Sequence, residues 1–170
     1  LGSENLSVDR YLSREFHELE VEHVWKHTWQ AVCRETEIPA SGDTQLYEIA
    51  GLSVIVTRLE NGELAAHRNV CLHRGRQLVD GNCNKKVFTC PYHAFTWDLD
   101  GSFKWAPCKW DFSHIEDEEF GLTEVQVDTW GGWVFINMDP DAVPLMEYLG
   151  VLPEHFKRWK PENGYKMVHV

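Results

Sequence analysis

The chain has 170 residues, of which 43% are hydrophobic and 25% are charged, so its composition suits one globular domain and argues against a disordered chain. Its 16 basic and 27 acidic side chains give a formal net charge of −11, which argues against binding to nucleic acid or to an anionic membrane, because both need clustered positive charge. No run of about 18 apolar residues is present, so the sequence predicts no membrane-spanning helix.

The predicted elements start with a helix over residues 11–27, where apolar side chains recur at helical spacing and Ser13 is a candidate cap. From residue 29 onward, short runs between turn signals predict strands at 29–33, 52–57, 63–68, 86–90, 95–99, 102–105 and 130–138. Two pairs of turn residues predict tight hairpins, Asn61-Gly62 and Asp100-Gly101.

Two short helices are predicted at 141–149 and 153–159, and the last residues, 165–170, resemble a strand again. Short antiparallel strands with helices at both ends predict a β-rich fold, mainly antiparallel, with flanking helices. A chain that stops inside a strand-like segment suggests truncation. We divide the chain into three parts, a helical segment at 1–28, a β-rich domain at 29–140 and a helical connection at 141–170.

Two Cys–His pairs carry the clearest chemical signal, Cys71-x-His73 and Cys90-x-x-His93. A cluster of two irons and two sulfides, with two cysteines on one iron and two histidines on the other, uses this set completely. The one-residue gap in the first pair is tight for two ligands of one tetrahedral ion, but it suits ligands of different irons. A structural zinc site is the alternative, although zinc modules usually space paired ligands by two to four residues.

The remaining cysteines, Cys33, Cys83 and Cys108, are interpreted as ordinary thiols, with Cys33 buried in a strand. An odd total of five cysteines favours thiols or metal ligands over a disulfide framework. The first residues show neither a basic nor an apolar signal region. These features together favour a cytoplasmic location.

Two further groups of histidines and carboxylates are weaker candidates for metal binding. His23 and His27 lie on one face of the predicted helix, near Glu20, but packing at a half-buried helix face is the favoured interpretation. His114 stands beside Glu116 and Asp117 in an acidic stretch, for which a solvated loop is favoured.

The runs Cys71-Leu72-His73-Arg74-Gly75 and Cys90-Pro91-Tyr92-His93 resemble the Rieske iron–sulfur motif. The wider sequence, from about Tyr11 to its end, is similar to the N-terminal part of the large (alpha) subunit of aromatic-ring-hydroxylating oxygenases. Supporting runs are 29–34, 42–43, 69–75, 88–93, 97–101 and 131–137. The resemblance implies a Rieske [2Fe-2S] fold in which Cys71 and Cys90 bind the inner iron while His73 and His93 bind the outer iron.

The resemblance also implies a function, which is one-electron transfer from a ferredoxin or a flavin reductase to a mononuclear Fe(II). That iron activates O2 for hydroxylation, dihydroxylation or demethylation of an aromatic or other small organic substrate. The family places its ligands in a C-terminal catalytic domain, so no catalytic residue is expected in this chain, and 141–170 would lead toward that absent domain. The implied partners are a neighbouring alpha subunit in a homo-oligomer, with or without a small beta subunit. A free-standing Rieske ferredoxin is the alternative.

The sequence departs from this family in one place, and from a related class in others. Ala94-Phe95 stands where the family usually has Gly-Trp, which affects the local geometry of the turn rather than ligation. Respiratory-type Rieske proteins have two extra, disulfide-forming cysteines, where this chain has Arg76 and Tyr92. They also have hydroxyl side chains at the positions of Phe95 and Trp97, so the resemblance predicts a low reduction potential here.

Overall fold

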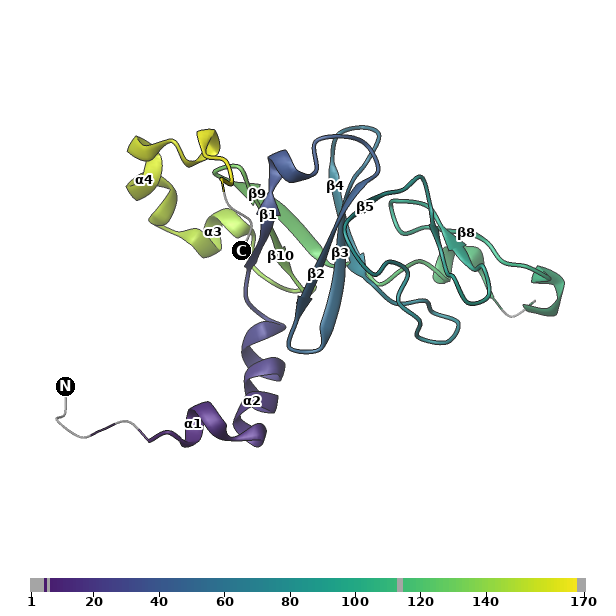
Figure 1. Ribbon diagram of the computed structural model, residues 1–170, viewed down its shortest axis with the longest axis horizontal. Coiled ribbons are helices and arrows are strands. Elements are labelled where there is room, and N and C mark those ends of the chain that lie inside the picture. Colours follow the sequence, from purple (N-terminus) through teal and green to yellow (C-terminus); the bar gives the residue numbers. More distant parts are fainter. Residues whose placement is uncertain (1–4, 6, 113–114, 168–170) are drawn as a thin grey trace.

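The computed structural model describes residues 5, 7–112 and 115–167, and it shows three antiparallel sheets with helices at both chain ends (Figure 1). The predicted β-rich, mainly antiparallel fold with flanking helices is therefore confirmed. The strands are β1 Gln30–Arg34, β2 Asp43–Ile49, β3 Leu52–Arg58, β4 Leu64–Arg68, β5 Cys83–Asn84, β6 Phe88–Thr89, β7 Thr96–Trp97, β8 Phe103–Trp105, β9 Gln126–Trp130 and β10 Trp133–Asn137.

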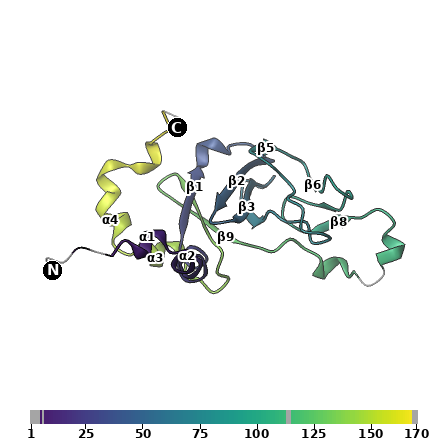
Figure 2. The same ribbon diagram turned by 60° about the horizontal axis from the view of Figure 1, so that its bottom comes forward.

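The sheets form two parts of the molecule. A three-stranded sheet in the order β1-β10-β9 and a four-stranded sheet in the order β4-β3-β2-β5 make a sandwich. The third sheet, β6-β7-β8, is small and lies at the other end from the chain termini (Figures 1 and 2). We call this third sheet, with the loops that lead into and out of it, the ligand-loop subdomain, residues 70–82 and 85–122, because β5 between these ranges belongs to the four-stranded sheet.

Strand β3 joins the two parts because it is buried on both faces. Val54 and Val56 face the core shared with β1 and β10, whereas Ile55 packs in the core beneath the third sheet. This is why the strand centre at 54–56 is continuously apolar and the run at 52–57 is rich in β-branched residues. One strand thereby supports both the sandwich and the subdomain that carries the two Cys–His pairs.

The hairpin predictions are confirmed, but several strand boundaries are wrong. Gly62 and Gly101 have φ of +87° and +85°, as tight turns between β3 and β4 and between β7 and β8 require. The predicted strands at 86–90 and 95–99 shrink to two residues each, since loops take over at both ends. Strands β2 and β9 were not predicted, because both are only partly buried and lack a clean alternation.

The predicted helix over 11–27 is interrupted. Ser13 is extended and separates α1 (Asp9–Leu12) from α2 (Arg14–Glu20), which continues as a π-helical turn, η1 (Val21–Trp25). Ser13 is nonetheless the cap, because its Oγ accepts a hydrogen bond from the Phe16 amide at 3.2 Å. Leu12 is 80% exposed, so the apolar face expected for this helix is not buried in the described structure.

The C-terminal part keeps two short helices and loses the expected final strand. The helices are α3 (Leu145–Leu149) and α4 (Leu152–Phe156), followed by the 3₁₀ turns η5 (Lys157–Trp159) and η6 (Pro161–Asn163). Residues 165–167 form no strand, so the strand predicted for 165–170 is wrong in this part. Residues 168–170 lie outside the described part of the chain. Within that part, no helix has both the length and the apolar character needed to cross a bilayer.

A buried arginine fastens the C-terminal segment to the sandwich. The Arg34 guanidinium donates hydrogen bonds to the carbonyl oxygens of Gly131 at 2.9 Å, Pro161 at 3.0 Å and Gly164 at 2.7 Å. It also lies over the Trp133 ring, 5.0 Å from the centroid. A planar group with several fixed donors suits such a set of acceptors, which a lysine ammonium does not match.

We expect Arg34→Lys to lower the free energy of unfolding by about 1–3 kcal/mol, because carbonyl groups at this buried position would lose their donors. Urea titration followed by tryptophan fluorescence measures the change. Arg14→Lys is the matched control, since Arg14 is fully solvated and its ion pair with Glu18 is long, at 3.8 Å. Equal effects of the two substitutions would contradict the assigned role of Arg34.

Candidate metal centre

The two ligand loops close on themselves in the same way. In the first loop, the Cys71 amide donates to the Arg76 carbonyl at 2.7 Å, and the Gly75 amide donates to the Cys71 carbonyl at 2.8 Å. In the second loop, the Cys90 amide donates to the Phe95 carbonyl at 2.8 Å, and the Ala94 amide donates to the Cys90 carbonyl at 2.9 Å. Each loop is thus a closed ring of backbone that starts at a cysteine.

The shared geometry makes Gly75 and Ala94 equivalent positions. Both have a positive φ, +71° at Gly75 and +60° at Ala94. Glycine adopts this conformation without a steric penalty, whereas a Cβ costs roughly 1–2 kcal/mol. Ala94, at the position where the family usually has glycine, therefore adopts the left-handed conformation itself, and the turn keeps its shape.

A buried asparagine fixes the first loop. The Asn69 side chain is 2% exposed, and its Oδ1 accepts from the amides of Leu78 at 2.9 Å and Val79 at 3.1 Å. Its Nδ2 donates to the Val79 carbonyl at 2.8 Å and to Ser53 Oγ at 3.1 Å. The chain before the loop is thereby tied to the chain after it. The role of this residue was not predicted from the sequence. The signal that could have found it is an amide side chain between the end of a strand and a predicted ligand cysteine.

The four predicted ligand residues meet where the loops face each other. Cys71 and Cys90 are both 2% exposed, whereas His73 and His93 are half-buried. The two imidazole rings are 4.8 Å apart, centroid to centroid, with their planes at 65°. Burial raises the pKa of the Cys71 thiol, the backbone amides of His73 and Arg74 act to lower it, and a hydrogen bond with Cys90 raises it.

The imidazoles are oriented by neighbouring rings. His73 stacks on Phe95 at 4.6 Å and 15°, and His93 contacts the ring of Tyr92 at 3.8 Å. Nδ1 of His73 is buried and has no hydrogen-bond partner in the described structure. A hollow of about 310 Å³ lies beside His73, with a floor of apolar side chains and the carboxylates of Glu116 and Glu119 on its lining.

This arrangement fits a two-iron cluster and does not fit a single zinc ion. The donor set is two sulfurs inside and two imidazoles outside, and one imidazole nitrogen is buried without a partner. Over the described residues, no group of three or more His, Cys, Asp or Glu side chains is arranged to hold one ion. Two protein ligands for each of two irons agree with both observations.

Neither of the two weaker metal-binding candidates is confirmed. His23 is exposed, whereas Nδ1 of His27 lies 2.7 Å from Asp139, away from Glu20. His114 lies outside the described residues, so its grouping with Glu116 and Asp117 stays a prediction. Burial raises the pKa of the Cys33 thiol to about 12, which agrees with an ordinary thiol in strand β1. The remaining thiols are Cys83, which lies in the short strand β5, and Cys108, which is exposed.

Comparisons with known proteins agree with this geometry. The family described as the Rieske [2Fe-2S] domain matches residues 28–116. The carnitine monooxygenase oxygenase subunit of Escherichia coli (strain K12) is 35% identical over 140 residues, which are 82% of this chain and 37% of that protein. The biphenyl 2,3-dioxygenase subunit alpha of Rhodococcus jostii (strain RHA1) is 34% identical, over 82% of this chain and 31% of that protein.

Solved structures show the same likeness. The apo form of the quaternary ammonium Rieske monooxygenase CntA matches with a TM-score of 0.85 and 30% identity, covering 91% of this chain and 45% of that one. Naphthalene 1,2-dioxygenase from Rhodococcus sp. bound to indole matches with a TM-score of 0.78 and 33% identity, covering 84% and 33%. This chain thus spans less than half of each of these proteins.

We expect Cys90→Ser to abolish the visible absorption of the purified protein and to remove its bound iron and sulfide, because a buried thiolate ligand is lost. Cys83→Ser is the matched control, since Cys83 is half-buried and lies between the two loops. Iron and acid-labile sulfide analysis measures both variants. Equal cluster content in the two variants would contradict the predicted ligand set.

We expect Ala94→Gly to stabilise the protein by roughly 0.5–1 kcal/mol, because removing the Cβ relieves the left-handed conformation by more than glycine adds to the entropy of the unfolded chain. Urea titration measures the change. Ala65→Gly in strand β4 should instead destabilise, since Ala65 has no positive φ. A loss of stability in both variants would contradict strain at Ala94.

Proposed function

This chain belongs to the Rieske [2Fe-2S] domain family, and we propose that it is the electron-transfer part of the large subunit of a non-haem iron oxygenase. One observation carries the proposal: two matched loops present buried thiols on the inside and imidazoles on the outside. The relatives that cover most of this chain are oxygenase subunits more than twice its length. The activity of the whole protein is therefore part of the proposal.

We assign Cys71 and Cys90 to the inner iron and His73 and His93 to the outer iron. When bound, the cluster accepts and releases one electron at a time. The chain orients the ligands and shields the site: Phe95, 1% exposed, holds the His73 ring in a stacked position. The backbone amides of His73 and Arg74 interact with the Cys71 sulfur, which favours the thiolate needed for ligation.

The partners follow from the same assignment. A ferredoxin or a flavin reductase supplies electrons, and a mononuclear Fe(II) in a following catalytic domain receives them. The proposed parts are the helical segment 1–28, the Rieske domain 29–140 and the connection 141–170. A neighbouring alpha subunit, with or without a small beta subunit, completes the enzyme. We propose a cytoplasmic location, where reduced thiols such as Cys33 persist.

The substrate class follows from the relatives only in outline. Their names refer to quaternary ammonium compounds, such as carnitine and glycine betaine, and to aromatic compounds, such as biphenyl and anthranilate. We propose oxygen-dependent hydroxylation, dihydroxylation or demethylation of one small organic molecule of this kind. The substrate itself would bind in the following domain.

The surroundings of the cluster site favour a low reduction potential. Hydrogen bonds to the cluster sulfurs raise the reduction potential. Respiratory-type Rieske proteins have hydroxyl side chains at two positions where this chain has Phe95 and Trp97, which carry none. The indole N–H of Trp97 already donates to the Phe120 carbonyl at 2.9 Å. Arg76 and Tyr92 leave no cysteine pair to form a disulfide beside the cluster.

We expect the dithionite-reduced protein to give a rhombic electron paramagnetic resonance signal with an average g below the free-electron value. The midpoint potential should be about −150 mV, at the low end of the Rieske range, because these hydrogen bonds are missing. A dye-mediated redox titration measures it, with iron and sulfide content determined on the same sample.

Two results would contradict different parts of this proposal. A colourless protein with stoichiometric zinc would overturn electron transfer. A rhombic signal with a midpoint potential above zero would support the cluster assignment. It would contradict the argument that the missing hydrogen bonds keep the potential low. Cys83→Ser should leave both signal and potential unchanged, because its thiol is not a proposed ligand.

A further inference from the structure

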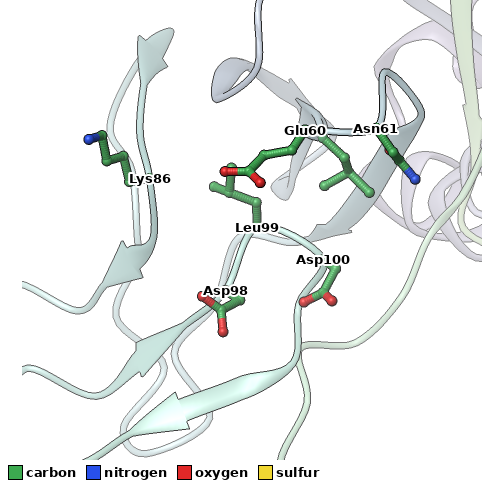
Figure 3. Close-up of a pocket in the computed structure, with 7 residues that line it drawn as sticks. Glu60, Asn61, Lys86, Asp98, Leu99 and Asp100 are labelled. Atoms are coloured by element: carbon green, nitrogen blue, oxygen red, sulfur yellow. The ribbon is translucent and has the colours of Figure 1, made fainter.

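The ligand-loop subdomain meets the sandwich at the β7–β8 turn, where packing is incomplete. Two hollows, of about 370 Å³ and 400 Å³, flank this turn and share Leu59 and Asp100 in their linings. Figure 3 shows the first hollow, with Glu60 of the β3–β4 turn above Leu99 and with Asp98 and Asp100 below it. The side chains between these hollows hold the turn against the sandwich, while the core around Ile55 joins the rest of the subdomain to it.

One of those side chains is a buried histidine. His67, on β4, is 3% exposed and pairs with Ile55 of β3 across the sheet. Its Nε2 lies against Gly101, where an added Cβ would be 2.2 Å away. An isolated bridge joins it to Glu124, in the segment before β9. The ring is thus enclosed by the strand, the turn and that segment.

The polar atoms of this ring favour the neutral imidazole over the imidazolium. The ring hydrogen-bonds with the backbone of Asp100, on the turn. Nδ1 is buried, and the described structure gives it no partner. A neutral imidazole leaves Nδ1 as an unprotonated acceptor, whereas an imidazolium would carry a buried N–H without an acceptor there.

The charges around the His67 ring do not reverse its preference for the neutral state. Burial lowers the pKa of His67, while the Asp100 backbone and the carboxylates of Glu124 and Asp100 act to raise it without cancelling the shift. Strand β3 places the uncharged Ile55 opposite. The folded joint therefore favours the neutral ring at neutral pH.

We propose that His67 makes the joint between the sandwich and the ligand-loop subdomain acid-sensitive, so that protonation of its ring releases the β7–β8 turn before the sandwich opens. In the opened joint the ring is solvated and binds a proton with a pKa of about 6.5. Because the closed joint binds this proton less readily, the free energy of opening falls as the pH drops below that value. The second ligand loop, which connects β6 to β7, would then move relative to the sandwich.

Hydrogen–deuterium exchange of the cluster-containing protein tests this, with the amides of β10 as an internal reference for the sandwich. Between about pH 7.5 and about pH 5.5, exchange in β7 and β8, corrected for its intrinsic rate, should accelerate by about 10-fold relative to β10 in the wild type. In His67→Gln and His67→Phe this ratio should not change with pH. Two substitutions are needed because one of them can fail to fold.

His23→Gln is the matched control, since His23 is an exposed histidine far from the joint, and it should behave as the wild type. The proposed ligands His73 and His93 are present in the wild type and in every variant. Any effect of pH on them is therefore common to all of these proteins and does not alter the comparison of exchange ratios. An unchanged ratio in the wild type, or the same acceleration in the His67 variants, would overturn the proposal. Neither result depends on electron transfer by the cluster.

Discussion

The structure depends on one constraint, which is that two thiols must lie inside an apolar core while two imidazoles stay at its edge. The two ligand loops satisfy this constraint in the same way. In each loop, backbone hydrogen bonds close a ring that starts at the cysteine, and the thiol at this start points inward. The third sheet supplies the floor through Phe88 and Trp97, together with Phe95 at the end of the second loop. Strand β3, buried on both faces, carries this floor on the sandwich.

Buried polar groups fix the parts that apolar packing leaves free. The Asn69 amide bonds to Leu78 and Val79 beyond the first loop and to Ser53 of β3, and the Trp97 indole anchors the chain near Phe120. Arg34 does the same for the C-terminal segment. Each has a demanding geometry, so each specifies one arrangement where hydrophobic contact alone would permit several. In the described structure three buried nitrogens lack a partner: Nε of Arg34, Nδ1 of His67 and Nδ1 of His73.

The sequence alone was informative where the signal is local. The Cys–His pairs, the β3–β4 hairpin and the turn at Gly101 depend on residues within a few positions of one another. Strands β2 and β9 were not predicted because they are only partly buried and show no clean alternation, although each pairs with the strand that follows it directly. Asn69 and His67 were missed for a different reason, since their roles exist only once the segment at 78–79 folds back onto Asn69 and the turn at 100–101 folds back onto His67.

Rings of six residues also set an order of events during folding. A loop closed over so short a stretch loses little chain entropy and forms fast, whereas pairing β1 with β10 joins opposite ends of the sequence and is slow. We therefore expect the cysteines and histidines to reach their local arrangement before the sandwich is complete. Cluster delivery in the cell would then meet a preformed receptor rather than an unfolded chain.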